Sequence, residues 1–237
     1  MRKRGKKYQE VAKLVDEEKR YVPEEALDLA KQTSYVNFDA SVEIHLRMGA
    51  DPKHADQQVR GVALLPHGLG KEVRVLVFAQ GEDVRVAEDA GADFIGDDER
   101  IKKIEGGWVE FDVAIATQEM MSKVGRLGRV LGRRGLMPNP RSGTVVQGSD
   151  LRRAIDEARK GRVEFRLDRS GVIHSVVGKV SFDTQKLKEN LATLMEAIMA
   201  ARPSTIKGQF VRTVALTTAM GPSIRLDVPA VIGMKVE

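Results

Sequence analysis

Six basic residues are interleaved with glycines in the segment KVGRLGRVLGRRGLMPNPRSGT, residues 123–144. They are Lys123, Arg126, Arg129, Arg133, Arg134 and Arg141. No Asp or Glu occurs between residues 120 and 149, so no carboxylate within this stretch neutralises them. Arginine donates paired hydrogen bonds to phosphate oxygens, and glycine lets a backbone approach a ligand closely. The segment therefore predicts a phosphate-binding loop, which would hold either the nucleotide of an enzyme or the backbone of a nucleic acid.

The charge distribution of the chain favours a polyanionic partner. The formal net charge is +5 and the pI is near 9.4. The positive surplus is concentrated in the segment above and in the first nine residues, MRKRGKKYQ, whereas acidic residues outnumber basic ones elsewhere. Two concentrated basic segments are typical of nucleic-acid binding, although the alternative of a solvated charge run remains, above all for the first nine residues.

The composition predicts an ordered globular protein of one or two domains. The chain has 237 residues, 42% of them apolar and 31% charged. It has no cysteine, which excludes disulfides and thiolate chemistry. No apolar segment follows the N-terminal charges, and no apolar run approaches the roughly 20 residues needed to span a bilayer. We therefore expect no secretory signal, no membrane helix and a cytoplasmic location.

Two kinds of hydrophobic pattern divide the chain. Strict alternation of apolar and polar residues predicts half-buried strands over 41–48, 162–168, 172–180, 210–218 and 223–228. The segments 162–168 and 172–180 flank the turn DRSG and are predicted to form a hairpin. Helical spacing is present over 8–20, 23–33, 150–161 and 184–202.

Between these strands the pattern changes to apolar strands alternating with short helices. The strands are predicted over 73–79, 92–95 and 112–116, and the helices over 82–91 and 97–105. This order is typical of a parallel sheet covered by helices. The fold class is therefore predicted as two-domain α/β, with a discontinuous, mainly antiparallel α+β domain interrupted by an inserted Rossmann-like three-layer α/β domain. The first domain would comprise 1–67 and 160–237, the second 68–159, with a hinge near 66–71 and 160–162.

The motifs of the common enzymes are absent. Gly70 and Lys71 are followed by Glu72, which does not match a phosphate-binding loop, and no dinucleotide fingerprint follows a predicted strand. Four histidines fall at unrelated spacings, and there is no G-x-S-x-G nucleophile motif. We expect no catalytic residue, metal or cofactor. The alternative hypothesis is a nucleotide-binding enzyme with a Rossmann-like domain.

One segment, GRVLGRRGLMPNPRSGTV at 128–145, closely resembles a signature of the family of ribosomal protein L-one, the first protein of the large ribosomal subunit, in its bacterial form. Further stretches resemble the family in the same order: 38–71, AGADFIG at 90–96, RVEFRLDRSGVIHSVVGK at 162–179 and TTAMGPSIRLD at 217–227. Together they extend over nearly the whole chain. The resemblance implies a protein that is not an enzyme and that acts as a monomer within the ribosome.

The resemblance also implies the partners and the interface. The family binds large-subunit rRNA at the mobile stalk beside the exit site, takes part in release of deacylated tRNA, and represses its own operon through a messenger site that mimics the ribosomal one. The RNA contacts implied in the first domain are Phe38, Ser41, Glu43, Arg166, Asp168, His174, Lys179, Thr218, Met220, Gly221, Pro222 and Ser223. The glycine-arginine segment is then a secondary contact to stalk RNA or tRNA. Ala219 and Asn37 depart from the family pattern, in which Thr and a basic residue are frequent.

Overall fold

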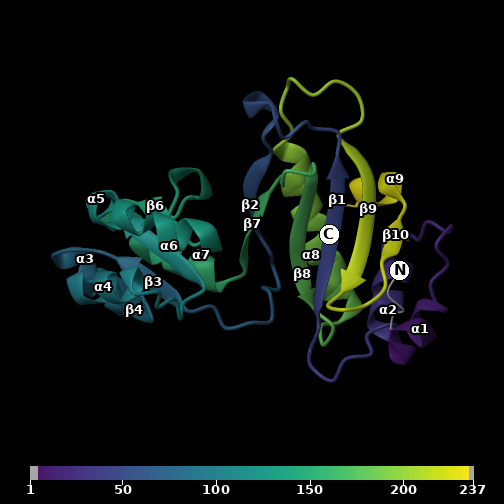
Figure 1. The fold of residues 1–237 in the computed structure, drawn as a ribbon, viewed down its shortest axis with the longest axis horizontal. Coiled ribbons are helices and arrows are strands. Elements are labelled where there is room, and N and C mark those ends of the chain that lie inside the picture. Colours follow the sequence, from purple (N-terminus) through teal and green to yellow (C-terminus); the bar gives the residue numbers. More distant parts are fainter. Residues whose placement is uncertain (1–4, 235–237) are drawn as a thin grey trace. The chain divides into compact units, whose positions relative to one another are not determined.

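The computed structural model describes residues 5–234 and forms two compact units. The first unit is made by Met1–Gly70 together with Val163–Glu237, and the second by Lys71–Arg162. An antiparallel sheet belongs to the first unit and a separate parallel sheet to the second (Figure 1). The predicted mixed α/β class, with two kinds of sheet, is confirmed. The basic residues Arg2, Lys3 and Arg4 lie outside the described residues.

The first unit is built on a four-stranded antiparallel sheet in the order β10-β9-β1-β8. The strands are β1 (Ser41–Met48), β8 (Val172–Lys179), β9 (Val211–Thr218) and β10 (Ile224–Leu226). In β1, alternate residues beginning at Val42 are buried, as the period-2 pattern predicts. Because successive side chains point to opposite faces, the polar residues of β1 share the other face of the sheet. We call that other face the open face.

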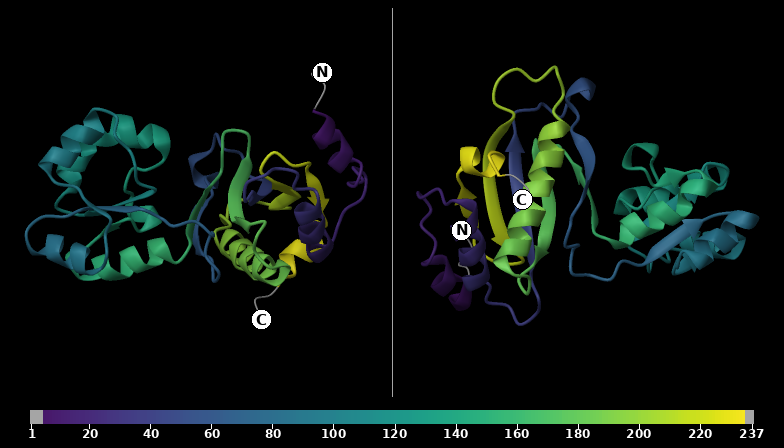
Figure 2. Two further views of the ribbon diagram at one scale, coloured as in Figure 1. Left: turned by 90° about the horizontal axis from the view of Figure 1, so that it is seen from below. Right: turned by 180° about the vertical axis from the view of Figure 1, so that it is seen from behind.

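Helices α2 (Pro23–Gln32) and α8 (Thr184–Ala200) cover the buried face of this sheet. Figure 1 views the sheet with α8 behind it, and the right-hand view of Figure 2 shows α8 in front. Pro23 suits the first turn of α2 because its missing N–H would have no partner there, and Glu24 and Glu25 lie near the positive end of the helix dipole. None of the described helices is long and apolar enough to cross a membrane.

The first helix is shorter than its spacing predicts, since α1 spans Lys6–Ala12 rather than 8–20. After Ala12 the chain turns, and the backbone N–H of Asp16 donates to the Tyr21 hydroxyl at 2.9 Å. Val15 and Tyr21 are both buried in the core of the first unit. The burial of these side chains outweighs the weak local preference for a longer helix.

The predicted hairpin of 162–168 and 172–180 is wrong. Strand β7 (Arg162–Arg166) pairs with β2 (Arg60–Leu64) in a separate two-stranded sheet, whereas β8 pairs with β1. An isolated bridge between Leu167 and Ile173 is what remains of the hairpin beside its turn. The Phe165 ring packs over Gly61, where a Cβ would lie 2.6 Å from the ring. A glycine in β2 therefore makes room for a partner distant in sequence.

The second unit contains a parallel sheet in the order β4-β3-β5-β6. Its strands are β3 (Val75–Phe78), β4 (Phe94–Ile95), β5 (Val113–Thr117) and β6 (Val145–Val146). All four residues of β3 are buried: Leu76 and Phe78 enter one hydrophobic cluster, whereas Val75 and Val77 enter another. This sheet is therefore covered on both faces, as continuous apolar strands predict.

Helices supply the two outer layers of the second unit. Helices α3 (Glu82–Asp89) and α7 (Leu151–Arg159) pack on the side of Val75 and Val77. On the side of Leu76 and Phe78 lie α4 (Asp98–Glu105), α5 (Met121–Val124) and α6 (Gly128–Arg134). The remaining short helices are α9 (Val228–Ile232) and the 3-10 turns Ala55–Gln57, Gly125–Leu127, Pro140–Ser142 and Gly148–Asp150.

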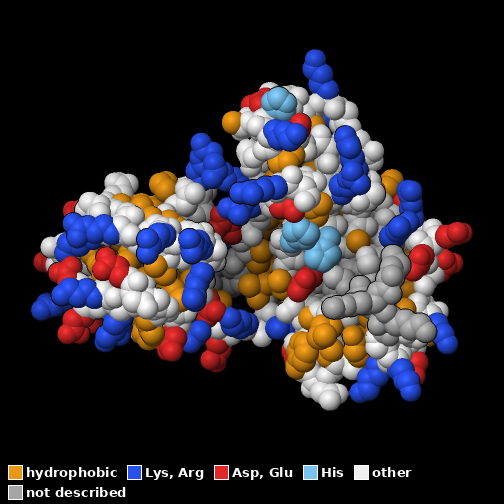
Figure 3. All heavy atoms as spheres, viewed as in Figure 1, with side chains coloured by type: hydrophobic (Ala, Val, Ile, Leu, Met, Phe, Trp, Pro, Cys, Tyr) orange, Lys and Arg blue, Asp and Glu red, His pale blue; other side chains and the backbone are white. Residues whose placement is uncertain are grey.

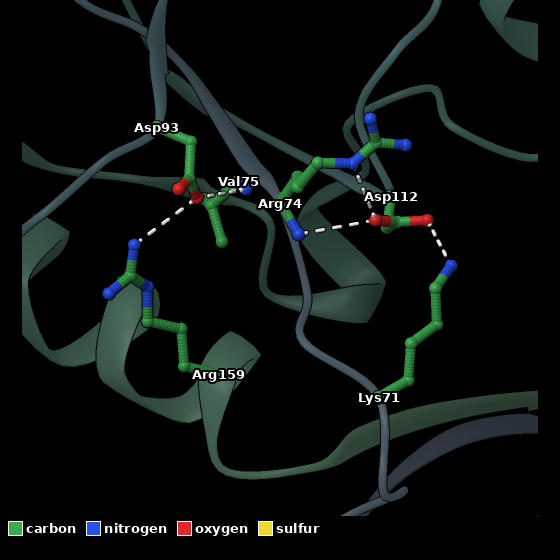
Figure 4. A network of polar contacts seen from close by, with 6 residues as sticks. All are labelled: Lys71, Arg74, Val75, Asp93, Asp112 and Arg159. Atoms are coloured by element: carbon green, nitrogen blue, oxygen red, sulfur yellow. Dashed lines mark hydrogen bonds and ion pairs between the residues drawn. The ribbon is translucent and has the colours of Figure 1, made fainter.

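Two carboxylates hold the amino-terminal end of strand β3 (Figure 4). Asp112 accepts hydrogen bonds from Lys71 Nζ at 2.5 Å and from the backbone N–H and Nε of Arg74 at 3.2 and 3.3 Å. Burial acts to raise the pKa of Asp112, but the hydrogen bonds and charges of Lys71 and Arg74 outweigh it, so the pKa is lowered. Asp112 therefore stays charged and holds the segment that leads into β3.

The second carboxylate, Asp93, lies just before β4. It accepts from the Val75 N–H at 2.8 Å and from Arg159 Nη2 at 3.2 Å, and the same guanidinium also donates to the Gly91 carbonyl (Figure 4). Arg159 is the last residue of α7. The beginning of β3 and the end of α7 are therefore held by one acidic side chain within this unit.

Candidate nucleic-acid interface

Three segments meet at the end of the open face where β1 begins. Ser41 pairs with Lys179 of β8, and Lys179 Nζ donates to the Ser41 hydroxyl at 3.0 Å and to the Asp39 carbonyl at 3.3 Å. On the other side, the Ala219 N–H donates to the Ser41 carbonyl at 2.9 Å. The structure thus brings together Ser41, Lys179 and the turn that follows β9.

Two large apolar side chains are exposed in these segments. Phe38, in the loop before β1, is 57% exposed, and Met220, in the turn after β9, is 69% exposed. Most apolar side chains of this size in the first unit are buried instead. An exposed aromatic ring and an exposed methionine in segments that meet at Ser41 offer apolar surface that can stack on bases or pack against sugars.

The Met220 backbone is held in an uncommon conformation. Met220 is the one non-glycine among the described residues with a positive φ, at 66°. The Tyr35 hydroxyl donates to the Met220 carbonyl at 3.1 Å, and Tyr8 of α1 packs edge-on against Tyr35 with ring centroids 6.4 Å apart. A left-handed conformation costs a non-glycine residue about 1–2 kcal/mol. The surrounding contacts offset that cost and keep the side chain pointing outward.

Thr218 differs in its position from the other predicted contacts. Its side chain is buried, and the Oγ1 atom has no hydrogen-bond partner among the described residues. Gly221 lies directly over this hydroxyl, so Thr218 supports the turn from beneath and does not offer its hydroxyl at the surface. The neighbouring Thr217 faces the other way and donates to the Pro222 carbonyl at 3.2 Å. Of the remaining turn residues, Pro222 is buried and Ser223 is exposed.

A row of four titratable side chains crosses the open face: Glu43, His45, His174 and Asp168. His45 and His174 are partners in the β1–β8 pairing, and their Nδ1 atoms are 2.8 Å apart. Nε2 of His45 lies 3.9 Å from the Glu43 carboxylate, and Nε2 of His174 lies 3.5 Å from the Asp168 carboxylate. Burial and the neighbouring His174 lower the pKa of His45, and Glu43 partly offsets them. We call these four residues the histidine row.

Asp168 also shapes the turn before β8. Its carboxylate accepts from the N–H groups of Ser170 and Val172 at 2.8 and 2.7 Å. Burial acts to raise the pKa of Asp168, but these bonds and His174 outweigh it and lower the pKa. Arg166, by contrast, is an exposed residue of β7 and belongs to the two-stranded sheet rather than to the sheet that carries the row. Among the described residues, no group of three or more His, Asp or Glu side chains is arranged to hold a metal ion.

His45 belongs to this site but was not among the residues predicted from the sequence. The alternation in β1 places it two residues after Glu43, on the same face. That spacing was a sufficient signal to include it. Its pairing with His174 could not be read from the sequence, because it depends on the register between strands 129 residues apart.

The glycine-arginine segment is helical as far as Arg134, where a loop is predicted from the sequence. Val124, Leu127 and Leu131 are buried against the parallel sheet, and their spacing of three and four residues is that of a helix. Gly128 and Gly132 lie within α6 in open surroundings. Because glycine has a low helix propensity, the glycines favour a loop prediction even though the three apolar residues have helical spacing.

This segment presents its arginines to solvent. Arg126, Arg129, Arg133, Arg134 and Arg141 are exposed, and none has an ion-pair partner among the residues the structure describes. Lys123 differs, because its Nζ is 3.0 Å from the Asp98 carboxylate. Blue basic side chains are prominent on the face drawn in Figure 3, over both units. Five arginines without carboxylate partners form a surface suited to a phosphate backbone.

Comparison with known proteins identifies the family to which the chain belongs. The model of the Ribosomal protein L1p/L10e family matches residues 30–222, more than half of the chain. The chain belongs to this family. The large ribosomal subunit protein uL1 of Chloroflexus aggregans is 57% identical over 236 residues, covering 99% of this chain and 100% of the relative. The uL1 proteins of Dehalococcoides mccartyi strain CBDB1 and Macrococcus caseolyticus are 60% and 55% identical over 230 and 227 residues. Those two alignments cover 97% and 96% of this chain and 97% of each relative.

The family membership confirms the resemblance drawn from the sequence motifs. The members of this family are ribosomal proteins and not enzymes, so the hypothesis of a nucleotide-binding enzyme is set aside. The parallel sheet of the second unit therefore does not imply catalysis, although many enzymes contain such a sheet.

Proposed function

We propose that the chain is a structural constituent of the large ribosomal subunit, in the cytoplasm, and that it binds large-subunit rRNA through the open face of its antiparallel sheet. The observation that carries the proposal is the convergence of exposed Phe38 and Met220 with Ser41 and Lys179 at one end of that face. The names of the similar proteins, large ribosomal subunit protein uL1, support the assignment to the subunit.

The chemistry of this end suits the shallow groove of an RNA helix or an irregular RNA junction. Phe38 and Met220 would pack against bases and sugars, and Gly221 would let the backbone of the turn approach the RNA. Lys179 supplies a cation for a phosphate, and the Ser41 hydroxyl and Glu43 carboxylate can bond to ribose 2′-hydroxyls. The 2′-hydroxyl contacts would distinguish RNA from DNA.

We propose that the two units act as domains, domain I comprising 1–67 and 160–237 and domain II comprising 68–159. The compact units support this division, with boundaries three residues away, after Gly70 and Arg162. The glycine-containing crossings at 66–71 and 160–162 would act as the hinge. Domain I would hold the primary RNA interface, because Phe38, Lys179 and Met220 all lie in the first unit.

The finer roles that we propose concern the stalk, the exit site and the messenger. The primary interface would bind stalk rRNA and, by mimicry, a site in the messenger of the protein's own operon, whose translation it would repress. The exposed arginines of α6 and its neighbours would form a secondary contact to stalk RNA or to exit-site tRNA, and so take part in release of deacylated tRNA. Within the ribosome the protein would be a monomer.

Footprinting of the full-length protein on total ribosomal RNA tests the primary assignment. We expect protection confined to one stem-loop region of the large-subunit RNA, and weaker protection there with a variant that carries Phe38→Ala and Met220→Ala. Protection spread evenly over both subunit RNAs, or unchanged by that variant, would show that the open face is not the interface.

A further inference from the structure

The histidine row has more positions for protons than two neutral imidazoles can fill. A proton is needed between the Nδ1 atoms of His45 and His174, which are 2.8 Å apart. Protons are also favoured on both Nε2 atoms, because each faces a carboxylate, at 3.9 and 3.5 Å. Two neutral imidazoles carry two N–H groups between them. One Nε2 of the neutral pair therefore stands without a proton in front of a carboxylate.

The geometry accommodates one additional proton and no more. With both imidazoles neutral, the row carries two negative charges, from Glu43 and Asp168, and repels an RNA backbone. One additional proton fills the vacant Nε2, keeps the Nδ1 contact and halves that charge. A second additional proton would place N–H groups on both of the facing Nδ1 atoms and break the 2.8 Å contact between them.

The neighbouring strands add cations but no further titrating group near neutral pH. On β1 the next open-face residue is Arg47, and on β8 the row is flanked by Val172 and Val176. The open-face residues of β9 are Thr213, Ala215 and Thr217, and Arg225 of β10 pairs with Ala215. Lys179 lies at the end of β8. These fixed positive charges attract RNA to the face, whereas the two carboxylates of the row oppose it.

The rings of the row differ in how easily a ligand reaches them. The His174 side chain is 55% exposed, whereas that of His45 is 29% exposed. A phosphate oxygen can therefore approach the His174 ring. The less exposed His45 ring contributes through the proton shared between the two Nδ1 atoms. An anion at that position stabilises the imidazolium form, since an opposite charge at short range favours the charged state.

We propose that the histidine row is a proton-coupled contact for an RNA phosphodiester, in which binding loads one proton onto the His45–His174 pair. The inference rests on the proposed function, because it requires RNA on the open face. Burial and the neighbouring His174 lower the pKa of His45 in the free protein, which favours uptake of the proton on binding. RNA affinity then rises as the pH falls, by at most about tenfold per pH unit for one proton.

The test uses the full-length protein and a transcribed fragment of large-subunit RNA from the stalk region, at constant ionic strength between pH 7.5 and 6.0. Wild-type affinity should rise toward pH 6.0. Calorimetry in two buffers of different ionisation enthalpy should show uptake of more than zero and up to one proton. In His45→Gln the uptake and the pH dependence should fall by at least half, with the fold checked by circular dichroism.

His54→Gln is the matched control, since His54 is an exposed loop histidine whose Nε2 lies 3.9 Å from Asp51. It should behave as wild type. Wild-type protein that binds the fragment without proton uptake overturns the inference and leaves the proposed function intact, as does His45→Gln with undiminished uptake. Wild-type protein that does not bind the fragment at any pH overturns the proposed function and this inference with it.

Discussion

The hydroxyl oxygen of Thr218 lies directly beneath Gly221, so that a Cβ on residue 221 would be 2.2 Å from it. The Gly221 N–H also donates to the Thr218 carbonyl at 2.8 Å, which fixes the two residues together. We expect Gly221→Ala to displace the turn that carries Met220. The free energy of unfolding should fall by about 1–3 kcal/mol, the usual cost of overpacking. RNA affinity should fall at least tenfold, or about 1.4 kcal/mol. Urea unfolding followed by circular dichroism and RNA titration measure the two effects.

A second substitution separates the clash from other effects of Gly221→Ala. Thr218→Ala removes the atom that would be struck, so the double variant should recover part of both losses. Thr218→Val is the matched control, because it keeps the shape and removes a hydroxyl that has no partner among the described residues. Its RNA affinity should stay within about threefold of wild type, since no exposed contact is lost. A loss of more than tenfold would show that the hydroxyl itself reaches RNA.

Phe38 and Met220 should affect binding far more than stability. Both side chains are mostly exposed, so replacing either with Ala should change the free energy of unfolding by no more than about 0.5 kcal/mol. If they stack on bases or sugars, each substitution should weaken RNA binding by about 1–3 kcal/mol. Leu64→Ala is the control, because Leu64 is 48% exposed in β2 of the same unit. Equal losses in Leu64→Ala and Phe38→Ala would place the interface elsewhere.

The sequence predicted well those elements whose type and bounds depend on the hydrophobic pattern of their own residues. Strand β1 begins and ends at Ser41 and Met48, as its alternation indicates, because one of its faces is buried and the other is not. The apolar residues of α8 are buried from Leu187 to Ile198, in agreement with the helical spacing that predicts a helix over 184–202. In each case hydrophobic spacing and burial agree over eight or more residues, which leaves few alternatives.

The errors arose where distant residues decide the outcome. Phe165 lies over Gly61, a contact between segments about a hundred residues apart, and this pairing replaced the predicted hairpin. The burial of Thr218 beneath Gly221 likewise depends on the folded turn. The helix around Leu127 and Leu131 is different, because its spacing was visible but the glycines and arginines suggested a loop.

Asp112 should make the stability of the second unit depend on acid pH. Its pKa is lowered in the folded state, because Lys71 and Arg74 outweigh burial. A lowered carboxyl pKa stabilises the fold above the ordinary pKa of Asp, and this contribution is lost as the pH falls through the folded pKa. Asp112→Asn should therefore lower the free energy of unfolding at pH 7 by about 1 kcal/mol, a value limited by solvent screening. The difference from wild type should shrink below pH 4.

The measurement can be confined to this unit, because Trp108 is the sole tryptophan and belongs to its hydrophobic cluster. Urea unfolding followed by its fluorescence, at pH 7 and pH 3, reports the second unit. Asp98→Asn is the control, since Asp98 pairs with Lys123 at 3.0 Å but is 76% exposed. Asp98→Asn should lower the free energy of unfolding at pH 7 by less than Asp112→Asn does. A loss in Asp112→Asn that is as large at pH 3 as at pH 7 would contradict the charge argument.

The arginines of the second unit should contribute little to binding of the stalk fragment. Replacing Arg126, Arg129, Arg133 and Arg134 together with Ala keeps the helix, because Ala has the highest helix propensity. Affinity for the fragment should change by less than about 1.5 kcal/mol, and the slope of log K against log salt by about one phosphate contact or fewer. In assembled ribosomes the same variant should release exit-site tRNA at an altered rate. Complete loss of fragment binding by the folded variant would make this segment the primary interface.

Substitution of Gly132 tests whether α6 requires glycine, independently of the charges of its arginines. It lies within α6, its φ is not positive, and no atom beyond its chain neighbours and the backbone of its own helix lies within 4 Å of where a Cβ would be. Nothing in the fold therefore requires glycine, and Gly132→Ala should raise the free energy of unfolding by about 0.5–1 kcal/mol, read by Trp108 fluorescence. If the glycine instead allows a phosphate backbone to approach α6, the methyl group should slow or speed exit-site tRNA release while leaving the stalk-fragment affinity within about threefold. A destabilised Gly132→Ala protein would contradict the open surroundings of this residue, and a tenfold loss of stalk-fragment affinity would contradict its place outside the primary interface.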